Sequence, residues 1–81
     1  MSRERKKPVK LQANTSGAWK DVVRFDADNT RAAAEVMDAA ETLGRVSAGD
    51  TTFRVVIDDG LGMVLYRWEI DHGWKEVSHA D

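Results

Sequence analysis

Two histidines and a few aspartates are the residues of this 81-residue chain whose types could do chemistry. His72 and His79 are the only histidines, and two of them without a suitably spaced third ligand make a weak zinc pattern. The chain has no cysteine, which excludes a thiolate metal site, a disulfide and a cysteine nucleophile. No serine lies in the strand–turn–helix setting of a nucleophile elbow.

Acid–base chemistry by paired carboxylates is the remaining catalytic arrangement to consider. Asp58 and Asp59 fall in one predicted turn and Asp71 in the next, at opposite ends of a strand and so about 20 Å apart. Carboxylates at that distance cannot act as a catalytic pair. The glycine-flanked segment 60–62 joins two strands and precedes no helix, so it does not match a phosphate loop. The sequence therefore predicts no enzymatic activity, no metal and no cofactor.

The elements that position these residues follow from hydrophobic periodicity. Alternation predicts strands over 9–13, 19–25, 52–58, 63–70 and 74–77, with Asp21 as a polar interruption of the second strand. An alanine-rich stripe predicts a helix that starts near Asp26–Thr30, runs to about Leu43 and ends at Gly44. The order β-β-α-β-β-β predicts an α+β fold of two layers, one helix packed on a four- or five-stranded antiparallel sheet.

The charge distribution divides the chain. The first ten residues hold five of the 12 basic residues and one of the 14 acidic residues, so a basic arm precedes an acidic body. We expect residues 1–8 to be disordered, residues 9–78 to form one domain and residues 79–81 to fray. The basic residues of the arm are Arg3, Arg5, Lys6, Lys7 and Lys10. They either bind phosphates or acidic surfaces, or only add charge to a solvated segment. The absence of a signal-peptide pattern and of a long apolar run predicts a cytoplasmic protein that does not associate with a membrane.

One helix covers one face of a sheet, so the other face is expected to meet water or a partner. The predicted core joins apolar residues of the strands and the helix, namely Trp19, Phe25, Phe53, Ile57, Trp68, Val36, Met37, Ala40 and Leu43. An alternative with Met63 and Leu65 inward stays open. The predicted binding surface on the other face mixes basic and aliphatic residues, namely Lys20, Val22, Arg24, Arg54, Val56, Leu65 and Arg67, and Lys75 and Val77 share that face.

Such a mixed face favours an acidic protein partner, nucleic acid or self-association across the sheet as a homodimer. Base stacking is disfavoured because most aromatic residues fall on the predicted buried face. Basic residues that only pair with acids on neighbouring strands would give the same pattern. The salt dependence of binding distinguishes an acidic protein partner from nucleic acid, because phosphate binding weakens steeply with ionic strength.

Two segments of the chain echo each other, Gly17-Ala18-Trp19-Lys20-Asp21-Val22 and Gly73-Trp74-Lys75-Glu76-Val77. They lie within two longer stretches, 16–23 and 73–79, which flank the alanine-rich segment 32–43. In this build the chain resembles the small accessory proteins of Mu-like phages and prophages, some of which are anti-CRISPR proteins or other inhibitors of host defence. The resemblance covers most of the chain and assigns no functional residue. It implies binding to a host or phage protein by surface complementarity. The sequence thus predicts a non-enzymatic binding protein, with a nucleic-acid-binding module as the alternative.

Overall fold

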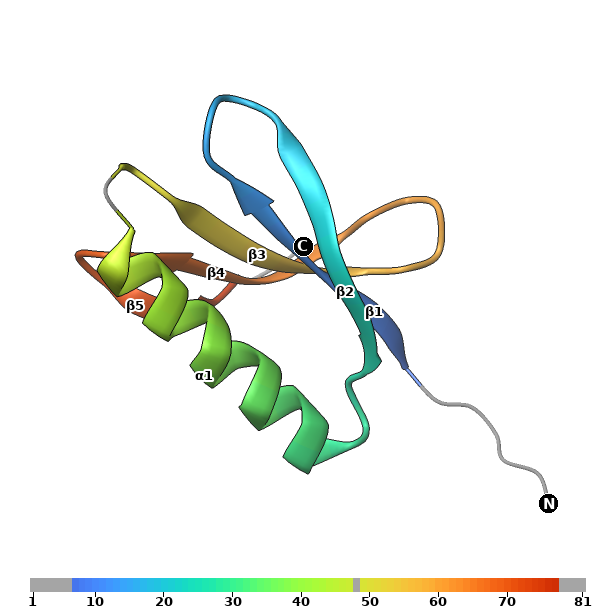
Figure 1. Cartoon of the computed structure of the whole chain (residues 1–81). Helices are drawn as coiled ribbons and strands as arrows, with labels where there is room; N and C mark the ends of the chain where they lie inside the picture. Colours follow the sequence, from blue (N-terminus) through green and yellow to red (C-terminus); the bar gives the residue numbers. More distant parts are fainter. Residues whose placement is uncertain (1–6, 48, 78–81) are drawn as a thin grey trace, which may run out of the picture.

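The structure, a computed structural model, describes residues 7–47 and 49–77. Its elements are β1 (Pro8–Asn14), β2 (Trp19–Asp26), α1 (Thr30–Val46), β3 (Thr52–Ile57), β4 (Val64–Glu69) and β5 (Gly73–Glu76). The strands form one antiparallel sheet in the order β2-β1-β3-β4-β5, and α1 lies across one face of it (Figure 1). This arrangement confirms the predicted α+β fold. We call the face opposite α1 the open face.

The core lies between α1 and the middle strands of the sheet. Its buried residues are Val9, Leu11, Ala40, Phe53, Val55 and Trp68. The rings of Phe53 and Trp68 meet edge to face with centroids 5.9 Å apart, a favoured aromatic geometry. On β5, the indole N–H of Trp74 donates to the carbonyl oxygen of Met37 at 3.0 Å and ties the edge of the sheet to the helix. The prediction that Phe53 and Trp68 face the helix is confirmed.

The helix starts as the sequence predicts but ends later. Its N-cap is Asn29, whose side-chain oxygen accepts a hydrogen bond from the amide of Ala32 at 3.0 Å. The helix continues through Gly44 to Val46, so the prediction that Gly44 ends it was wrong. Gly44 is buried against the ring of Trp68, and a Cβ atom there would lie no farther than 3.0 Å from three ring carbons. The glycine therefore allows the helix to approach the sheet closely.

A β-bulge in β2 changes which residues face the helix. Val23 lies opposite Leu11 of β1, whereas Asp21 lies opposite Gln12, so Val22 is an extra residue in β2. Val22 and Val23 both line a groove beside α1 and therefore share the helix side of the sheet. The prediction that Val22 lies on the open face was wrong.

The same bulge reverses the facing of the residues before it. Trp19 lies opposite Asn14 and carries the guanidinium of Arg54 over its ring, which places it on the open face. Lys20 lies opposite Ala13, which packs against the core, so Lys20 belongs to the helix side. The predictions of an inward Trp19 and an open-face Lys20 were both wrong for this one reason.

A second bulge acts in the same way in β4. Val55 of β3 lies opposite Tyr66, but the next residue, Val56, lies opposite Val64, so Leu65 is the extra residue. Leu65 packs against the core on the helix side. The prediction of an open-face Leu65 was therefore wrong. Trp68 faces the helix as predicted, and Leu65 faces it too, as in the alternative assignment of this strand.

Candidate functional site

A row of polar side chains crosses the open face, one from each strand. The cross-strand registers place these residues side by side in the order Asp21, Gln12, Arg54, Arg67 and Lys75. Residues directly opposite each other in antiparallel strands point to the same face, with Cβ atoms about 5 Å apart. We call these five residues the transverse row. It has a carboxylate at the β2 end and three cations toward β5.

The carboxylate end of the transverse row is neutralised within the chain. Asp21 accepts a hydrogen bond from Nε2 of Gln12 at 2.8 Å and from Nζ of Lys10 at 3.3 Å. The bond from Gln12 is the main cause that lowers the pKa of Asp21, with Lys10 and Arg24 adding to it against a desolvation effect that raises it. Asp21 is thus held in its charged form by its neighbours.

Replacing Gln12 by alanine is expected to raise the pKa of Asp21 toward its ordinary value of 3.8. Because the folded pKa is lowered, the linked stabilisation is present above the unfolded pKa and is lost as the pH falls through the folded pKa. The side-chain carboxyl carbon of Asp21, followed by NMR from pH 6 downward, measures the shift. An unchanged curve for Asp21 would contradict the assigned role of Gln12.

The central cation of the row is held in a fixed position. Nε of Arg54 donates to Oε1 of Gln12 at 2.7 Å, and its guanidinium carbon lies 4.1 Å from the ring centroid of Trp19. This is a cation–π arrangement, and it orients Arg54 without neutralising it. Burial lowers the pKa of Arg54, and the neighbouring charge of Arg67 lowers it further.

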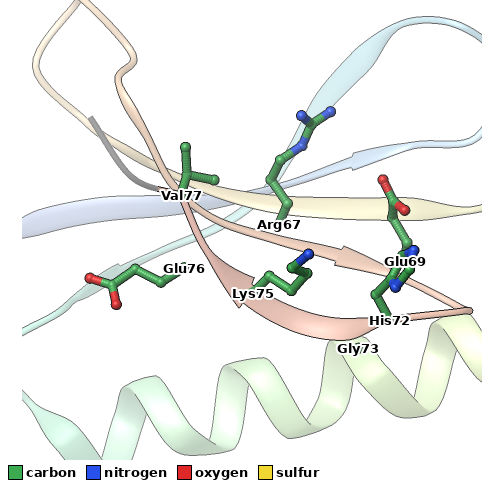
Figure 2. A pocket seen from close by; sticks show the side chains of 7 residues that line it. All are labelled: Arg67, Glu69, His72, Gly73, Lys75, Glu76 and Val77. Atoms are coloured by element: carbon green, nitrogen blue, oxygen red, sulfur yellow. The ribbon is translucent and has the colours of Figure 1, made fainter. Parts of the chain in front are cut away.

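At the cationic end of the row, the three cations form no ion pair with a described carboxylate. Of the described residues, no carboxylate lies within 4 Å of a side-chain nitrogen of Arg54, Arg67 or Lys75. Arg67 and Lys75 border a hollow of about 280 Å³ at the β5 edge, together with the acidic residues Glu69 and Glu76 and with Val77. Figure 2 shows Arg67, Glu69 and Val77 on the side of the strands away from α1. Like charges placed directly opposite each other destabilise a sheet, so this end can gain from an anion.

The other predicted surface residues contribute less than the transverse row. Arg24 lies on the open face as predicted, but its Nε is 2.9 Å from Oδ2 of Asp58 and its charge is balanced there. Val56 also lies on the open face but is only 1% exposed, beneath a hollow bordered by Gly60 and Leu61 of the β3–β4 loop. Neither residue therefore offers a free contact at the centre of the face.

Most of the predicted basic arm, including Arg3, Arg5 and Lys6, lies outside the described residues. The predicted tail 79–81 also lies outside them. The backbone N–H of Lys7 donates to Oδ1 of Asp26 at 3.0 Å, and Lys10 is a residue of β1. These two lysines are therefore part of the folded domain, and Lys10 serves the carboxylate end of the transverse row.

The described residues, 7–47 and 49–77, were also compared with the requirements of a metal site and of a membrane span. Within these ranges, no three His, Asp or Glu side chains are grouped closely enough to hold a metal ion. The described helix is too short and too polar to cross a membrane. Comparison of the chain with protein-family models, with curated proteins and with solved structures found no match. The transverse row is therefore the feature of the described residues that bears on function.

Proposed function

We propose that this chain is a small non-enzymatic binding protein that receives an acidic protein surface on its open face. The observation that supports the proposal is the adjacency of Arg54, Arg67 and Lys75 on three neighbouring strands, with no carboxylate of the described residues within 4 Å. Three cations side by side, none of them in an ion pair with a described carboxylate, cost stability in the free protein. Carboxylates of a partner would offset that cost. The binding free energy gained is therefore larger than three isolated surface charges would provide.

Apolar residues at the margin of the row favour a protein over a simple polyanion. Leu61 is 87% exposed and borders the same hollow as Gln12 and Arg54. Val77 borders the hollow at the other end, next to Arg67 and Lys75. Protein interfaces combine apolar contacts with charge pairs in this way. The resemblance to phage accessory proteins extends the proposal to an inhibitor of a host system that acts in the cytoplasm.

Nucleic acid is the second candidate, and the position of Trp19 favours it. The ring lies on the open face beneath the guanidinium of Arg54, at 4.1 Å, in line with the cations of the transverse row. Proteins that hold single strands combine aromatic rings with a cationic track. The basic residues Arg3, Arg5 and Lys6 would then add phosphate contacts.

Binding to two fluorescent probes tests the proposal. One probe is a short peptide of glutamate and leucine residues, and the other is an oligothymidine of equal charge. We expect the triple variant Arg54→Ser, Arg67→Ser, Lys75→Ser to lose at least about tenfold in affinity for the peptide, as followed by fluorescence anisotropy. A matched triple variant, Lys20→Ser, Arg31→Ser, Arg45→Ser, removes the same charge outside the open face and should bind as the wild type does.

The pattern of losses distinguishes the candidates. Equal losses in both triple variants would mean that only net charge matters and would overturn the proposal. Tighter binding of the oligothymidine than of the peptide, with a steeper salt dependence, would replace the acidic protein by nucleic acid. Wild-type affinity in the Arg54, Arg67 and Lys75 variant would place the function elsewhere on the molecule.

A further inference from the structure

An apolar groove of about 310 Å³ runs along the helix side of the sheet, between α1 and β2. Its walls include Val22 and Val23 of β2 and Ala39 and Leu43 of α1. Leu43 was predicted in the core, but it is 55% exposed, because the helix turns Ala40 and Gly44 toward the sheet instead. Four aliphatic residues thus remain in contact with water on one side of the helix.

The groove lies next to a free strand edge. β2 has eight residues and stands at the edge of the sheet, where β1 is its neighbour among the described strands (Figure 1). The backbone N–H and C=O groups on the outer side of an edge strand are a template for another strand. A single occupant could therefore pair with β2 and cover the groove at the same time.

The facing pattern of β2 is symmetric about the peptide bond between Val22 and Val23. Val22 and Val23, next to that bond, both lie on the helix side, and so do Lys20 and Phe25. Asp21 and Arg24 both lie on the open face, and so do Trp19 and Asp26. The bulge at Val22 creates this symmetry. A strand with such a pattern matches the facing of an antiparallel copy of itself.

Only one register pairs all eight residues with an identical strand, and it places Val22 opposite Val23 of the second copy. Every residue then lies opposite one on the same face. A shift by one residue in either direction would put Val22 opposite Arg24 or Val23 opposite Asp21, on opposite faces. The facing therefore selects a register, as it does in ordinary sheets.

The selected register is also complementary in charge. Asp21 lies opposite Arg24 of the second copy, and Arg24 lies opposite Asp21, which gives two cross-strand pairs of opposite charge. Within one copy Arg24 already lies 2.9 Å from Asp58 and 4.0 Å from Asp21, and the side chains of Asp21 and Arg24 are 45% and 66% exposed, so the pairs between copies would add to these contacts. A two-fold axis perpendicular to the sheet keeps both helices on the same side, so that each groove faces the other and Leu43 is covered.

We propose that a second copy of the chain occupies the groove, through antiparallel pairing of β2 with β2. The dimer joins two five-stranded sheets into one and leaves both transverse rows exposed on a continuous open face. This interface differs from self-association across the open face, which would cover Arg54 and Arg67. It does not depend on the proposed function.

Charge-reversed variants of the full chain test the register. The wild type should sediment at about twice the mass of 9.0 kDa at micromolar concentration. Asp21→Arg places Arg opposite Arg24, and Arg24→Asp places Asp opposite Asp21, so each variant alone should dissociate at least about tenfold more readily. Mixed in equal amounts, the two variants should form a heterodimer, because both cross-strand pairs are then of opposite charge.

Leu43→Lys provides a variant that leaves β2 intact, since this exposed side chain can be changed without altering the core. It should shift the protein to the monomer while its circular dichroism spectrum stays that of the wild type. A wild type that remains monomeric at several hundred micromolar would overturn the proposal. A dimer of unchanged strength in Leu43→Lys and in both charge-reversed variants would also overturn it and would place the interface elsewhere.

Discussion

Replacing Trp68 by alanine is expected to lower the free energy of unfolding by about 3–5 kcal/mol, which is most of the stability of a domain of this size. Trp68 is buried, packs edge to face on Phe53 and fills the space left by Gly44. Removing the indole leaves a cavity between helix and sheet that the fixed backbones cannot close. Urea denaturation followed by circular dichroism at 222 nm measures the loss.

Trp19→Ala is the matched control for Trp68→Ala. It removes the same side chain from the open face, where the ring is half-buried and touches Arg54. We expect it to cost less than about 1 kcal/mol, the size of one partly exposed cation–π contact with modest burial. Equal losses in the two variants would contradict the assignment of Trp68 to the core and of Trp19 to the open face.

Gly44→Ala is expected to destabilise the domain by about 1–3 kcal/mol, although alanine is favoured over glycine in a helix by about 1 kcal/mol. The sign reverses because the added Cβ would overlap Cζ3 and Cη2 of Trp68. A rigid ring cannot turn away as the end of a flexible chain could, so α1 must move off the sheet.

A double-mutant cycle separates this clash from other effects of the substitution. In a Trp68→Leu background, Gly44→Ala should cost less than in the wild type, because the benzo ring that it meets is gone. Thermal denaturation of the four proteins measures the coupling. Equal costs in both backgrounds would mean that Trp68 is not what requires a glycine at position 44.

The helix and the inward residues of β3 were predictable because their signals are local. Residues 30–43 carry a stripe of helical period, and Phe53 and Val55 alternate with polar or outward residues. The place of β1 between β2 and β3 was not predictable, since it depends on pairing with β3, which follows the helix in the chain. That pairing is what brings Gln12 between Asp21 and Arg54.

The errors in the candidate site come from the two bulges. Alternation assigns Lys20, Val22 and Leu65 to the open face, and one inserted residue in each strand moves them to the helix side. The sequence held one signal of the first bulge: Asp21 would have interrupted an otherwise apolar face. With a bulge at Val22, Asp21 faces water on the open face, and Trp19 lies on the same face. Arg54 and Arg67 lie outside both bulged segments, and their predicted facing is confirmed.

An NMR titration with the glutamate–leucine peptide tests whether the transverse row is the binding surface. The three indole N–H signals report on different places: Trp19 on the open face, Trp68 in the core, and Trp74 bonded to the carbonyl of Met37 on the helix side. We expect the signals of the Trp19 indole and of the backbone amides of Arg54 and Arg67 to shift with added peptide, while the signal of the Trp74 indole does not shift. Shifts at Trp74 and along α1, with Trp19 unmoved, would contradict the assignment of the binding surface to the transverse row.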